Sequence, residues 1–501
     1  MERTLPNPAF IASLAPINFD DAKRLVSRVP GNANVLEYRL DLAAGRISSR
    51  ALLELDPRCT VVTYRTTREG GKFDGSVEEY RRSVQSAYDA GAAVDVELDS
   101  GLLEDSAFLP DRSRVIGSRH ADEWPKQGLS RDLAADVAAI KLVRTNVASV
   151  PAAAACVAAL RELSGSRPIG CFATGRRGSF TRIVGPQFGA GLTYGSVETP
   201  TADGQIPLSD LLDVYRIGRT SREGKIFAVY GGDVSSSLSP RIHNTLFARR
   251  GLPHLYLPIS SSEGPANGRT LLGDLAALEG LGLLPDGLSV TNPFKSAFES
   301  IVEAIDEDDA VARTGAANTL VRLEEPGGEP RFLARNTDSD AVLEILSGRG
   351  LAGRRTLILG NGGAARAAAH AAGLAGCEVF LTGRDARKVK PVADRFGAAA
   401  VPREDVSRLD AELLVNATPL GARDDDPNPF SGELFRRRPA VIDFAYRGSG
   451  ETPLIRESRE RGCDAADGLE ILARQAVGQA KLFGVGDVTL EEIDSILRVA
   501  R

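Results

Sequence analysis

The sequence predicts an α/β protein in which a parallel (β/α)8 barrel precedes a second α/β region. In the first part of the chain, eight short β-rich runs alternate with helical patterns, and about 220 residues is an ordinary length for such a barrel. Further along, a glycine-rich turn at Gly360–Gly363 stands between a strand and a helix. An open doubly wound sheet is the alternative for the first part, but no glycine-rich fingerprint occurs there.

The elements follow from the hydrophobic pattern. The barrel strands are expected at residues 10–14, 35–40, 61–65, 94–98, 115–118, 139–143, 169–172 and 192–195. A polar stretch at 218–224 indicates an interdomain linker before a strand at 225–229. A strand at 356–359, a helix from 364 to about 372, a strand at 378–381 and a basic turn at 383–388 follow in dinucleotide-binding order.

Composition excludes several classes of protein. The 501 residues are 43% hydrophobic and 26% charged, as in globular proteins, and the net charge of −6 argues weakly against nucleic acid as a partner. No apolar run is long enough to span a membrane, and Met1–Thr4 opens no signal peptide. Five scattered cysteines and four histidines without ligand spacing predict a cytoplasmic protein with no metal site.

Polar residues cluster at the ends of the expected barrel strands, where barrels place their active sites. Lys141 lies inside an apolar strand, and burial favours its neutral amine, a nucleophile that forms Schiff bases with ketones. The alternative is an ion pair that only closes the barrel. His120 is either a structural imidazole or the base that removes a proton beside the iminium. Arg39, Arg65 and Arg182 suit a carboxylate-bearing substrate, unless they form surface ion pairs.

Several segments of the first part resemble type I 3-dehydroquinate dehydratase. They are Glu37–Asp41, Tyr64–Gly71, Phe180–Arg182 and Thr201–Gln205, together with His120 and Lys141. The resemblance implies that Lys141 forms the imine, that His120 is the general acid and base, and that Glu69 positions His120. The substrate-binding residues that it implies are Glu37, Arg39, Arg65, Arg182, Thr201 and Gln205.

The second region carries a dinucleotide fingerprint. Gly360, Gly362 and Ala365 have the G-x-G-x-x-A spacing that lets a backbone approach a pyrophosphate at a helix N-terminus. A tight turn without a ligand is the alternative. Basic side chains after the next strand favour NADP, because they could bind its 2′-phosphate. Asp385 favours NAD instead, because a carboxylate there could accept from a ribose hydroxyl. These basic residues are Arg384, Arg387 and Lys388.

Four polar clusters precede this fingerprint, at 237–240, 290–295, 315–319 and 336–338. Turn and capping chemistry explains any one of them. Together, ahead of a dinucleotide fold, they indicate a polyol-binding domain that faces a nicotinamide. Lys295 and Asp338 are expected to exchange a proton with the substrate oxygen as hydride moves.

These clusters resemble shikimate dehydrogenase, as do Asn416–Gly421, Asp443 with Tyr446, Thr452–Leu454 and Gly468–Gln475. The resemblance implies a catalytic pair, Lys295 and Asp338. The implied substrate residues are Ser237, Ser239, Thr291, Asn318, Tyr446 and Gln475. The implied cofactor residues are Gly360, Gly362, Gly363, Ala364, Arg384 and Thr418.

The whole chain thus resembles a fusion of the two families, and the dehydratase product is the dehydrogenase substrate. We expect a dehydratase TIM barrel at 1–218, a substrate-binding domain at 225–345, a Rossmann NADP-binding domain at 346–475, and C-terminal helices at 476–501 that return to the substrate domain. The expected partners are 3-dehydroquinate, 3-dehydroshikimate and shikimate, with neither nucleic acid nor membrane. An NAD-linked quinate dehydrogenase and a non-catalytic metabolite sensor are the alternatives.

Overall fold

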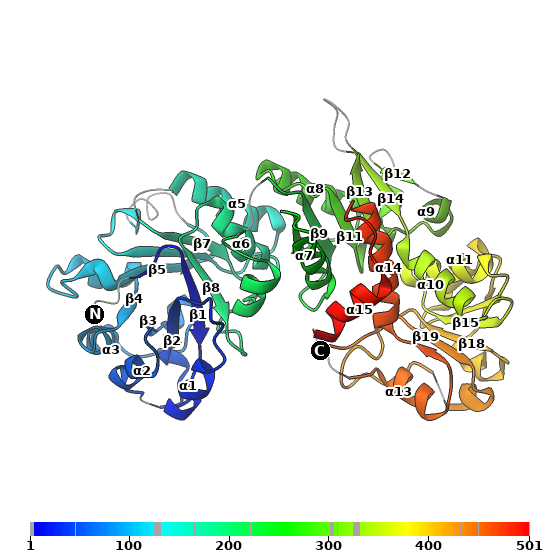
Figure 1. The fold of residues 1–501 in the computed structure, drawn as a ribbon, viewed down its shortest axis with the longest axis horizontal. Helices are drawn as coiled ribbons and strands as arrows, with labels where there is room; N and C mark the ends of the chain where they lie inside the picture. Colours follow the sequence, from blue (N-terminus) through cyan, green and yellow to red (C-terminus); the bar gives the residue numbers. More distant parts are fainter. Residues whose placement is uncertain are drawn as a thin grey trace. The chain divides into compact units, whose positions relative to one another are not determined.

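The computed structural model describes residues 5–45, 47–124, 132–163, 167–219, 223–300, 305–307, 309–323, 331–430, 432–448 and 450–499. The chain divides into two compact units (Figure 1). Unit 1 comprises Met1–Gly224, Pro253–Glu263 and Gly273–Leu284. Unit 2 comprises Lys225–Leu252, Gly264–Leu272 and Pro285–Arg501.

Eight parallel strands form the centre of unit 1, which confirms the predicted barrel. Their order is β7-β6-β5-β4-β3-β2-β1-β8. The strands are β1 (Ala9–Leu14), β2 (Val35–Arg39), β3 (Cys59–Thr63), β4 (Ala93–Glu97), β5 (Val115–Ala121), β6 (Ala139–Arg144), β7 (Ile169–Ala173) and β8 (Leu192–Ser196).

The two end strands of this order, β7 and β8, meet at a narrow seam. The backbone N–H of Gly191 donates to the carbonyl of Ile169 at 2.8 Å. A side chain at Gly170 would place its Cβ 2.9 Å from Cβ of Leu192, so the absence of a side chain lets the strands approach. The sheet is thereby nearly closed into a barrel.

Helices surround the barrel strands, and polar residues begin several of them. They are α1 (Phe19–Val26), α2 (Ser49–Leu55), α3 (Val77–Asp89), α5 (Val150–Leu163) and α6 (Ser179–Val184). Asn18 caps α1 by accepting the N–H of Asp21, and Ser76 and Glu79 form a capping box at α3. These caps satisfy N–H groups that have no partner within the helix.

The barrel interior changes from apolar to polar along the strands. Apolar side chains from all eight strands pack together, including Ile11, Val61 and Ile116. Two residues further along, the same faces carry buried polar groups. This next layer consists of Ser13, Glu37, Thr63, Asp95, Ser118 and Lys141. The carboxyl ends of the strands therefore hold a polar layer above an apolar floor.

The described part of residues 225–499 contains helices and two six-stranded sheets. The mixed sheet has the order β10-β9-β11-β13-β14-β12. Its strands are β9 (Ile226–Gly231), β10 (Leu255–Ser260), β11 (Gly287–Val290), β12 (Ile305–Glu307), β13 (Thr319–Leu323) and β14 (Arg331–Arg335). The helices that accompany it are α7 (Ser239–Arg249), α8 (Gly268–Gly280), α9 (Asp309–Thr314) and α10 (Thr337–Gly348).

The second sheet is fully parallel, in the order β17-β16-β15-β18-β19-β20. This is the doubly wound order of a Rossmann fold. The strands are β15 (Arg355–Leu359), β16 (Glu378–Thr382), β17 (Ala399–Ala400), β18 (Leu413–Asn416), β19 (Ala440–Asp443) and β20 (Ala465–Ala466). The helices are α11 (Gly363–Leu374), α12 (Ala386–Arg395), α13 (Pro453–Glu460), α14 (Gly468–Leu482) and α15 (Leu490–Val499). Near the end of the chain, Glu492 on α15 pairs with Arg250 at 2.7 Å, at the end of α7.

Two predicted elements were wrong in detail. The third strand ends at Thr63, so Arg65 follows the strand and does not lie in it. The expected turn at 383–388 is shorter, because Asp385 accepts the N–H of Arg387 and begins α12 at Ala386. Within the predicted linker at 218–224, residues 220–222 lie outside the described residues.

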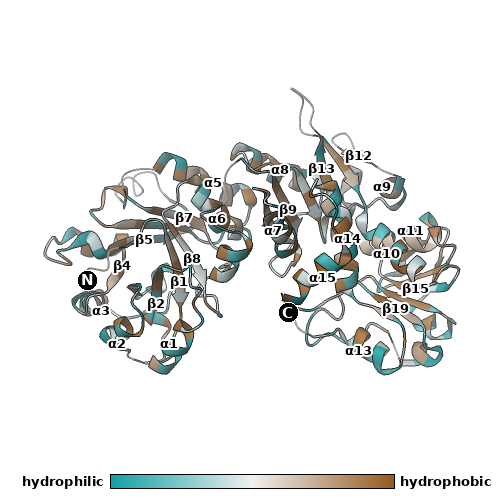
Figure 2. Cartoon of the chain, in the orientation of Figure 1, coloured by the Kyte–Doolittle hydropathy of each residue, from teal (hydrophilic) through white to brown (hydrophobic). Residues whose placement is uncertain are grey.

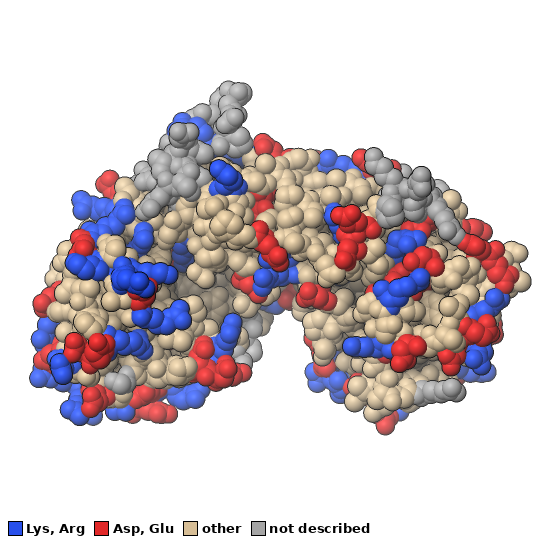
Figure 3. All heavy atoms as spheres, turned by 180° about the vertical axis from the view of Figure 1, so that it is seen from behind, with Lys and Arg blue, Asp and Glu red and all other residues tan. Residues whose placement is uncertain are grey.

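The surface is that of a protein with interspersed charges. Hydrophobic residues concentrate in strands such as β7 and β15, whereas helices α1 and α13 show both hydrophobic and hydrophilic residues (Figure 2). Basic and acidic side chains are mixed over the face shown in Figure 3. Among the described helices, none combines the length and apolar character needed to cross a membrane.

Candidate active sites

Lys141 lies in the polar layer of the barrel with a carboxylate beside it. Its Nζ is 2.7 Å from Oδ2 of Asp95 and 3.6 Å from Oε1 of Glu37. The Tyr194 ring lies below the amine, with its centroid 4.5 Å from Nζ. The ion pair considered as an alternative for Lys141 is therefore present, and it lies among the residues expected to bind substrate.

His120 and Glu69 form a hydrogen-bonded pair. Nδ1 of His120 is 2.9 Å from Oε2 of Glu69, which also accepts the backbone N–H of His120 at 3.2 Å. Burial, followed by the nearby positive charges, holds the pKa of His120 well below its usual value. Its imidazole is therefore neutral at physiological pH, and the bond through Nδ1 leaves Nε2 as the basic nitrogen.

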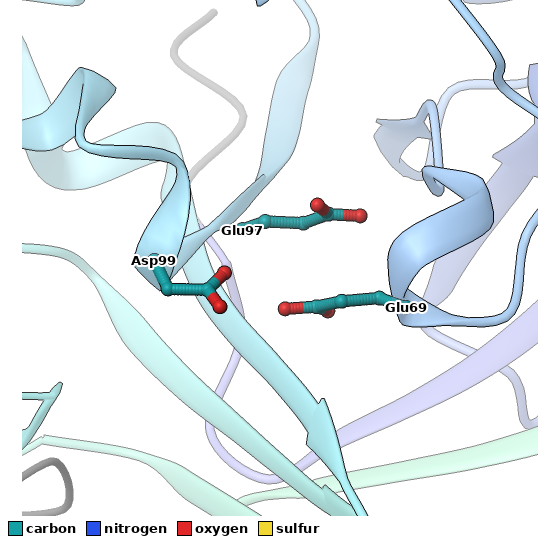
Figure 4. Close-up of side chains that lie close together, drawn as sticks. All are labelled: Glu69, Glu97 and Asp99. Carbon is teal, nitrogen blue, oxygen red and sulfur yellow. The ribbon is translucent and has the colours of Figure 1, made fainter.

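Arg65 is buried within a cluster of carboxylates. It donates to Asp95 at 2.7 Å, to Glu69 at 2.7 Å and to Glu97 at 3.3 Å. Figure 4 shows the side chains of Glu97 and Asp99, from the end of β4 and the turn after it, facing the side chain of Glu69 from the turn after β3. Burial and these acidic neighbours raise the pKa of Glu69 to about 8, against the opposing effect of Arg65. The donors of Arg65 are thus directed at protein carboxylates, whereas the sequence predicted a substrate contact.

In contrast to Arg65, Arg182 has a side-chain donor without a hydrogen-bond partner in the described part of the chain. Its side chain is buried over the Phe172 ring, with the guanidinium carbon 4.1 Å from the centroid, and Nε has no hydrogen-bond partner among the described residues. Burial lowers the pKa of Arg182 to about 10. A buried guanidinium with an unmet donor is suited to an anionic ligand.

The remaining predicted residues of the barrel site are linked by hydrogen bonds. Oγ of Ser13 joins Glu37 at 2.5 Å to Oγ1 of Thr201 at 2.7 Å. Thr201 is held by Oε1 of Gln205, which accepts its backbone N–H at 2.8 Å. Arg39 donates to the Thr201 carbonyl at 3.0 Å. One chain of contacts therefore connects strands β1 and β2 to the loop after β8.

The mixed-sheet part of unit 2 brings Lys295, Asp338 and Asn318 together. Nζ of Lys295 donates to Oδ2 of Asp338 at 2.5 Å. Nδ2 of Asn318 donates to Oδ1 of Asp338 at 2.9 Å, so both carboxylate oxygens are held. Asn336 caps α10 by accepting the N–H of Ser339, which fixes the start of the helix that carries Asp338. The predicted pair has the geometry of a lysine oriented by an aspartate.

The other predicted substrate residues are less closely connected. Oγ of Ser237 accepts the backbone N–H of Ser239 at 3.3 Å. Burial raises the pKa of Tyr446, which also has a hydrogen bond with the backbone of Leu238, so Tyr446 lies against this turn. Gln475 donates to the carbonyl of Leu472 at 3.0 Å. Thr291 follows β11, and its backbone N–H donates to the Tyr230 carbonyl at 2.9 Å.

The glycine-rich turn lies directly against Lys295. A Cβ at Gly363 would be 2.6 Å from Cβ of Lys295, and one at Gly360, where φ is +133°, would be 3.0 Å from the Ala417 carbonyl oxygen. A Cβ at Gly362 would meet nothing within 4 Å, so this side of the turn is open to a ligand. Gly363 begins α11 and Ala364 follows in its first turn.

Comparison with known proteins agrees with both halves of this geometry. Residues 11–222 match the type I 3-dehydroquinase family, and residues 229–320 match the shikimate dehydrogenase substrate-binding domain. The bifunctional 3-dehydroquinate dehydratase/shikimate dehydrogenase of Arabidopsis thaliana, described as chloroplastic, is 27% identical over 95% of this chain and 82% of its own length. The chain belongs to the bifunctional 3-dehydroquinate dehydratase/shikimate dehydrogenase family.

The dehydrogenase half has further relatives. The NADP(+) shikimate dehydrogenase of Rubrobacter xylanophilus is 35% identical over 52% of this chain and 91% of its own length. A crystal structure of the shikimate 5-dehydrogenase of Thermus thermophilus, in complex with NADP(H) and shikimate, is 32% identical and covers 55% of this chain and 100% of its own, with a TM-score of 0.48.

The cofactor-side residues of this bifunctional protein fit a dinucleotide. Arg384 is exposed after β16 and has no ion-pair partner among the described residues. Asp385, which in the sequence favoured NAD, forms an ion pair with Arg387 and caps α12. Thr418 donates through Oγ1 to Asn416 at 2.7 Å. The open glycine turn and an exposed guanidinium are suited to a pyrophosphate and a 2′-phosphate.

Sequence reasoning missed buried groups that lie next to both sites. Asp95 and Glu97, an i, i+2 pair on β4, have the same period-two signal that drew attention to Glu37 and Arg39, and could have been found by it. Asp443 was noted only as part of a motif. Its buried carboxylate accepts from Asn416 at 2.8 Å and from Thr452 at 2.6 Å, which ties together the loops after β18 and β19.

Proposed function

We propose that the barrel dehydrates 3-dehydroquinate to 3-dehydroshikimate and that the dehydrogenase half reduces this product to shikimate with NADPH. The observation that carries the proposal is a pair of constellations. A buried lysine, Lys141, shares the polar layer with the His120–Glu69 pair, and Lys295 is held by Asp338 in front of a glycine-rich turn.

In the dehydratase, the ammonium of Lys141 first gives a proton to the neutral imidazole of His120, and Nζ then attacks the ketone carbon of the substrate. The carbonyl oxygen leaves as water, and the nitrogen becomes an iminium. Nε2 of His120 removes the proton from the adjacent carbon, and the iminium takes up the electron pair. The protonated imidazole then donates that proton to the leaving hydroxyl, which departs as water, and Glu69 holds the ring through Nδ1. Hydrolysis of the product iminium by water releases 3-dehydroshikimate and restores the amine of Lys141.

Substrate binding by the barrel is assigned to the residues around this pair. Arg182, with its unmet donor, binds the substrate carboxylate. Thr201 and Gln205, with Glu37 and Arg39, form the hydroxyl-binding side through their existing hydrogen bonds. Arg65 acts through the carboxylates that surround it, because its donors already contact them.

In the dehydrogenase, Lys295 supplies the proton. NADPH, when bound, supplies hydride to the carbonyl carbon of 3-dehydroshikimate. Lys295 donates a proton from Nζ to the carbonyl oxygen, and Asp338 keeps that amine in place at 2.5 Å. Asn318 holds the second oxygen of Asp338, and the substrate hydroxyls are assigned to the predicted residues Ser237, Ser239, Thr291, Tyr446 and Gln475.

The cofactor and the setting of the protein are part of the same proposal. Gly360, Gly362, Gly363 and Ala364 cradle the pyrophosphate, and Arg384 binds the 2′-phosphate, which selects NADP over NAD. All five cysteines are free thiols, which supports a reducing cytoplasmic location. The boundaries 1–218, 225–345, 346–475 and 476–501 stand as proposed domains.

One assay tests both activities. Purified protein is mixed with 3-dehydroquinate and NADPH, and the loss of reduced-nicotinamide absorbance is followed, with shikimate identified as product. Lys141→Ala is expected to abolish this reaction but to leave the reduction of added 3-dehydroshikimate intact. Lys295→Ala is expected to abolish the reduction of 3-dehydroshikimate but to leave the dehydration of 3-dehydroquinate intact. If NADPH is not consumed when either 3-dehydroquinate or 3-dehydroshikimate is added to wild-type protein, the proposed function is wrong.

A further inference from the structure

One of the two most buried carboxylates on β4 belongs to Asp95, which the roles above do not use. We propose that Asp95 is the fixed counter-ion of the nitrogen at Lys141, first of its ammonium and then of the iminium formed with substrate. The inference deepens the proposed dehydratase function, because it requires that Lys141 form an imine.

The two oxygens of Asp95 have separate partners. Oδ1 accepts from Arg65 Nη2 at 2.7 Å and from Ser118 Oγ at 2.5 Å. Oδ2 faces Lys141 Nζ at 2.7 Å. The carboxylate is 1% exposed and is therefore held in one orientation, with one oxygen anchored to the barrel wall and the other directed at the reacting nitrogen.

Glu37 is the competing carboxylate, and its geometry is less suited to this role. Its Oε1 is 3.6 Å from Lys141 Nζ and accepts the hydroxyl of Thr63 at 2.9 Å. Its Oε2 accepts the hydroxyl of Ser13 at 2.5 Å. Both oxygens of Glu37 thus have hydroxyl partners, whereas Asp95 presents an oxygen to Nζ at charge-assisted hydrogen-bond distance.

The chemistry of the imine gives this contact a purpose. When Nζ has attacked the ketone carbon and water has left, the nitrogen keeps one proton and carries the positive charge. That charge makes it the acceptor for the electron pair released from the adjacent carbon. Arg65 and Lys141, acting against burial, lower the pKa of Asp95 to about 2, so the carboxylate stays ionised and leaves the proton on the iminium.

Other charged and titratable groups surround the pair from every side of the barrel. They are Glu37 and Arg39 on β2, Arg65 after β3, Glu69 after it, Glu97 on β4, His120 on β5, Arg182 on α6 and Tyr194 on β8. Of these, Glu97 is the closest match to Asp95. It lies on the same strand, is equally buried and also contacts Arg65, but its other partners are Thr66 and Arg68.

Asp95→Asn therefore has a matched control in Glu97→Gln. The experiment measures dehydration of 3-dehydroquinate from pH 6 to pH 10, and borohydride trapping of the imine on Lys141 by mass spectrometry over the same range. In the pH profile of kcat, we expect the decline on the alkaline side (the basic limb) to begin about one pH unit or more lower in Asp95→Asn than in wild type. The reason is that a neighbouring opposite charge typically shifts a pKa by that amount. At high pH, trapping should fall about tenfold, whereas Glu97→Gln should follow wild type.

The outcomes separate the inference from the function on which it rests. If wild-type protein forms no trapped adduct at Lys141, the proposed dehydratase function fails. If wild type is trapped but Asp95→Asn keeps the wild-type basic limb, or Glu97→Gln shifts it equally, the counter-ion role is overturned. If Asp95→Asn does not fold, Ser118→Ala is the substitute variant, because it removes the hydroxyl that donates to Oδ1 of Asp95. It should shift the basic limb in the same direction by a smaller amount. An unchanged basic limb would also overturn the counter-ion role of Asp95.

Discussion

The contact between the glycine turn and Lys295, the proposed proton donor, predicts the effect of Gly363→Ala. The new Cβ would lie 2.6 Å from Cβ of Lys295, whereas ordinary contacts begin at 3.4 Å, so the two backbones must separate by 0.8 Å. Lys295 is held on its other side by Asp338 at 2.5 Å. Because a misplacement of about 1 Å at a reacting group costs roughly 10²-fold in rate, we expect kcat for dehydroshikimate reduction to fall about 100-fold.

The assay follows NADPH consumption with added 3-dehydroshikimate, and dehydration by the barrel serves as an internal control that should not change. Gly373→Ala is the matched variant, because it lies in the same helix and its Cβ would meet nothing within 4 Å. It should keep wild-type kcat and gain up to about 1 kcal/mol of stability. If Gly363→Ala has a kcat within threefold of Gly373→Ala, the packing argument is refuted.

Three further predictions concern charge. Glu69→Gln should lower dehydratase kcat by about 10- to 100-fold, and most strongly above pH 8, because the pKa of Glu69 is raised to about 8 and only its ionised carboxylate stabilises the imidazolium of His120 by charge; an equal loss at every pH would contradict this. Burial raises the pKa of Asp443 to about 6, so the stability it contributes is present at low pH and is lost as pH rises through 6. Asp443→Asn should therefore flatten the change in the free energy of unfolding between pH 4 and pH 7, by roughly 1–3 kcal/mol, and a slope equal to wild type would count against the shift. Arg384→Ala should raise KM for NADPH at least tenfold with little change for NADH, and equal effects on both would disprove 2′-phosphate recognition.

The barrel could be predicted from sequence because its strands are short apolar runs separated by helices. The proposed role of Lys141 was accessible for the same reason, because Lys141 interrupts such a run and a charge there is conspicuous. Lys295 and Asp338 were paired from the polar clusters that carry them, but the pattern could not show the 2.5 Å contact between two residues 43 positions apart.

The partners of charged groups could not be predicted in the same way. Arg65 was expected to bind substrate, but three carboxylates from the loop after β3 and from β4 converge on it. Such convergence depends on strand register, which sequence periodicity leaves undetermined. An ion pair was one alternative for Lys141, but the sequence does not show that its partner is Asp95, which lies 2.7 Å away on a different strand.

The seam between β7 and β8 has a consequence for the motion of the barrel. Neighbouring strands elsewhere share continuous ladders, whereas these two meet where Gly191 donates to Ile169 and Gly170 lies against Leu192. Local opening costs least where the fewest hydrogen bonds must break, so the backbone amides at this joint should exchange with solvent before those of β2 to β5. Because Arg182 follows one of these strands and Thr201 follows the other, breathing at the joint would widen the mouth of the barrel on its substrate-binding side without disturbing the strands that carry Asp95 and His120.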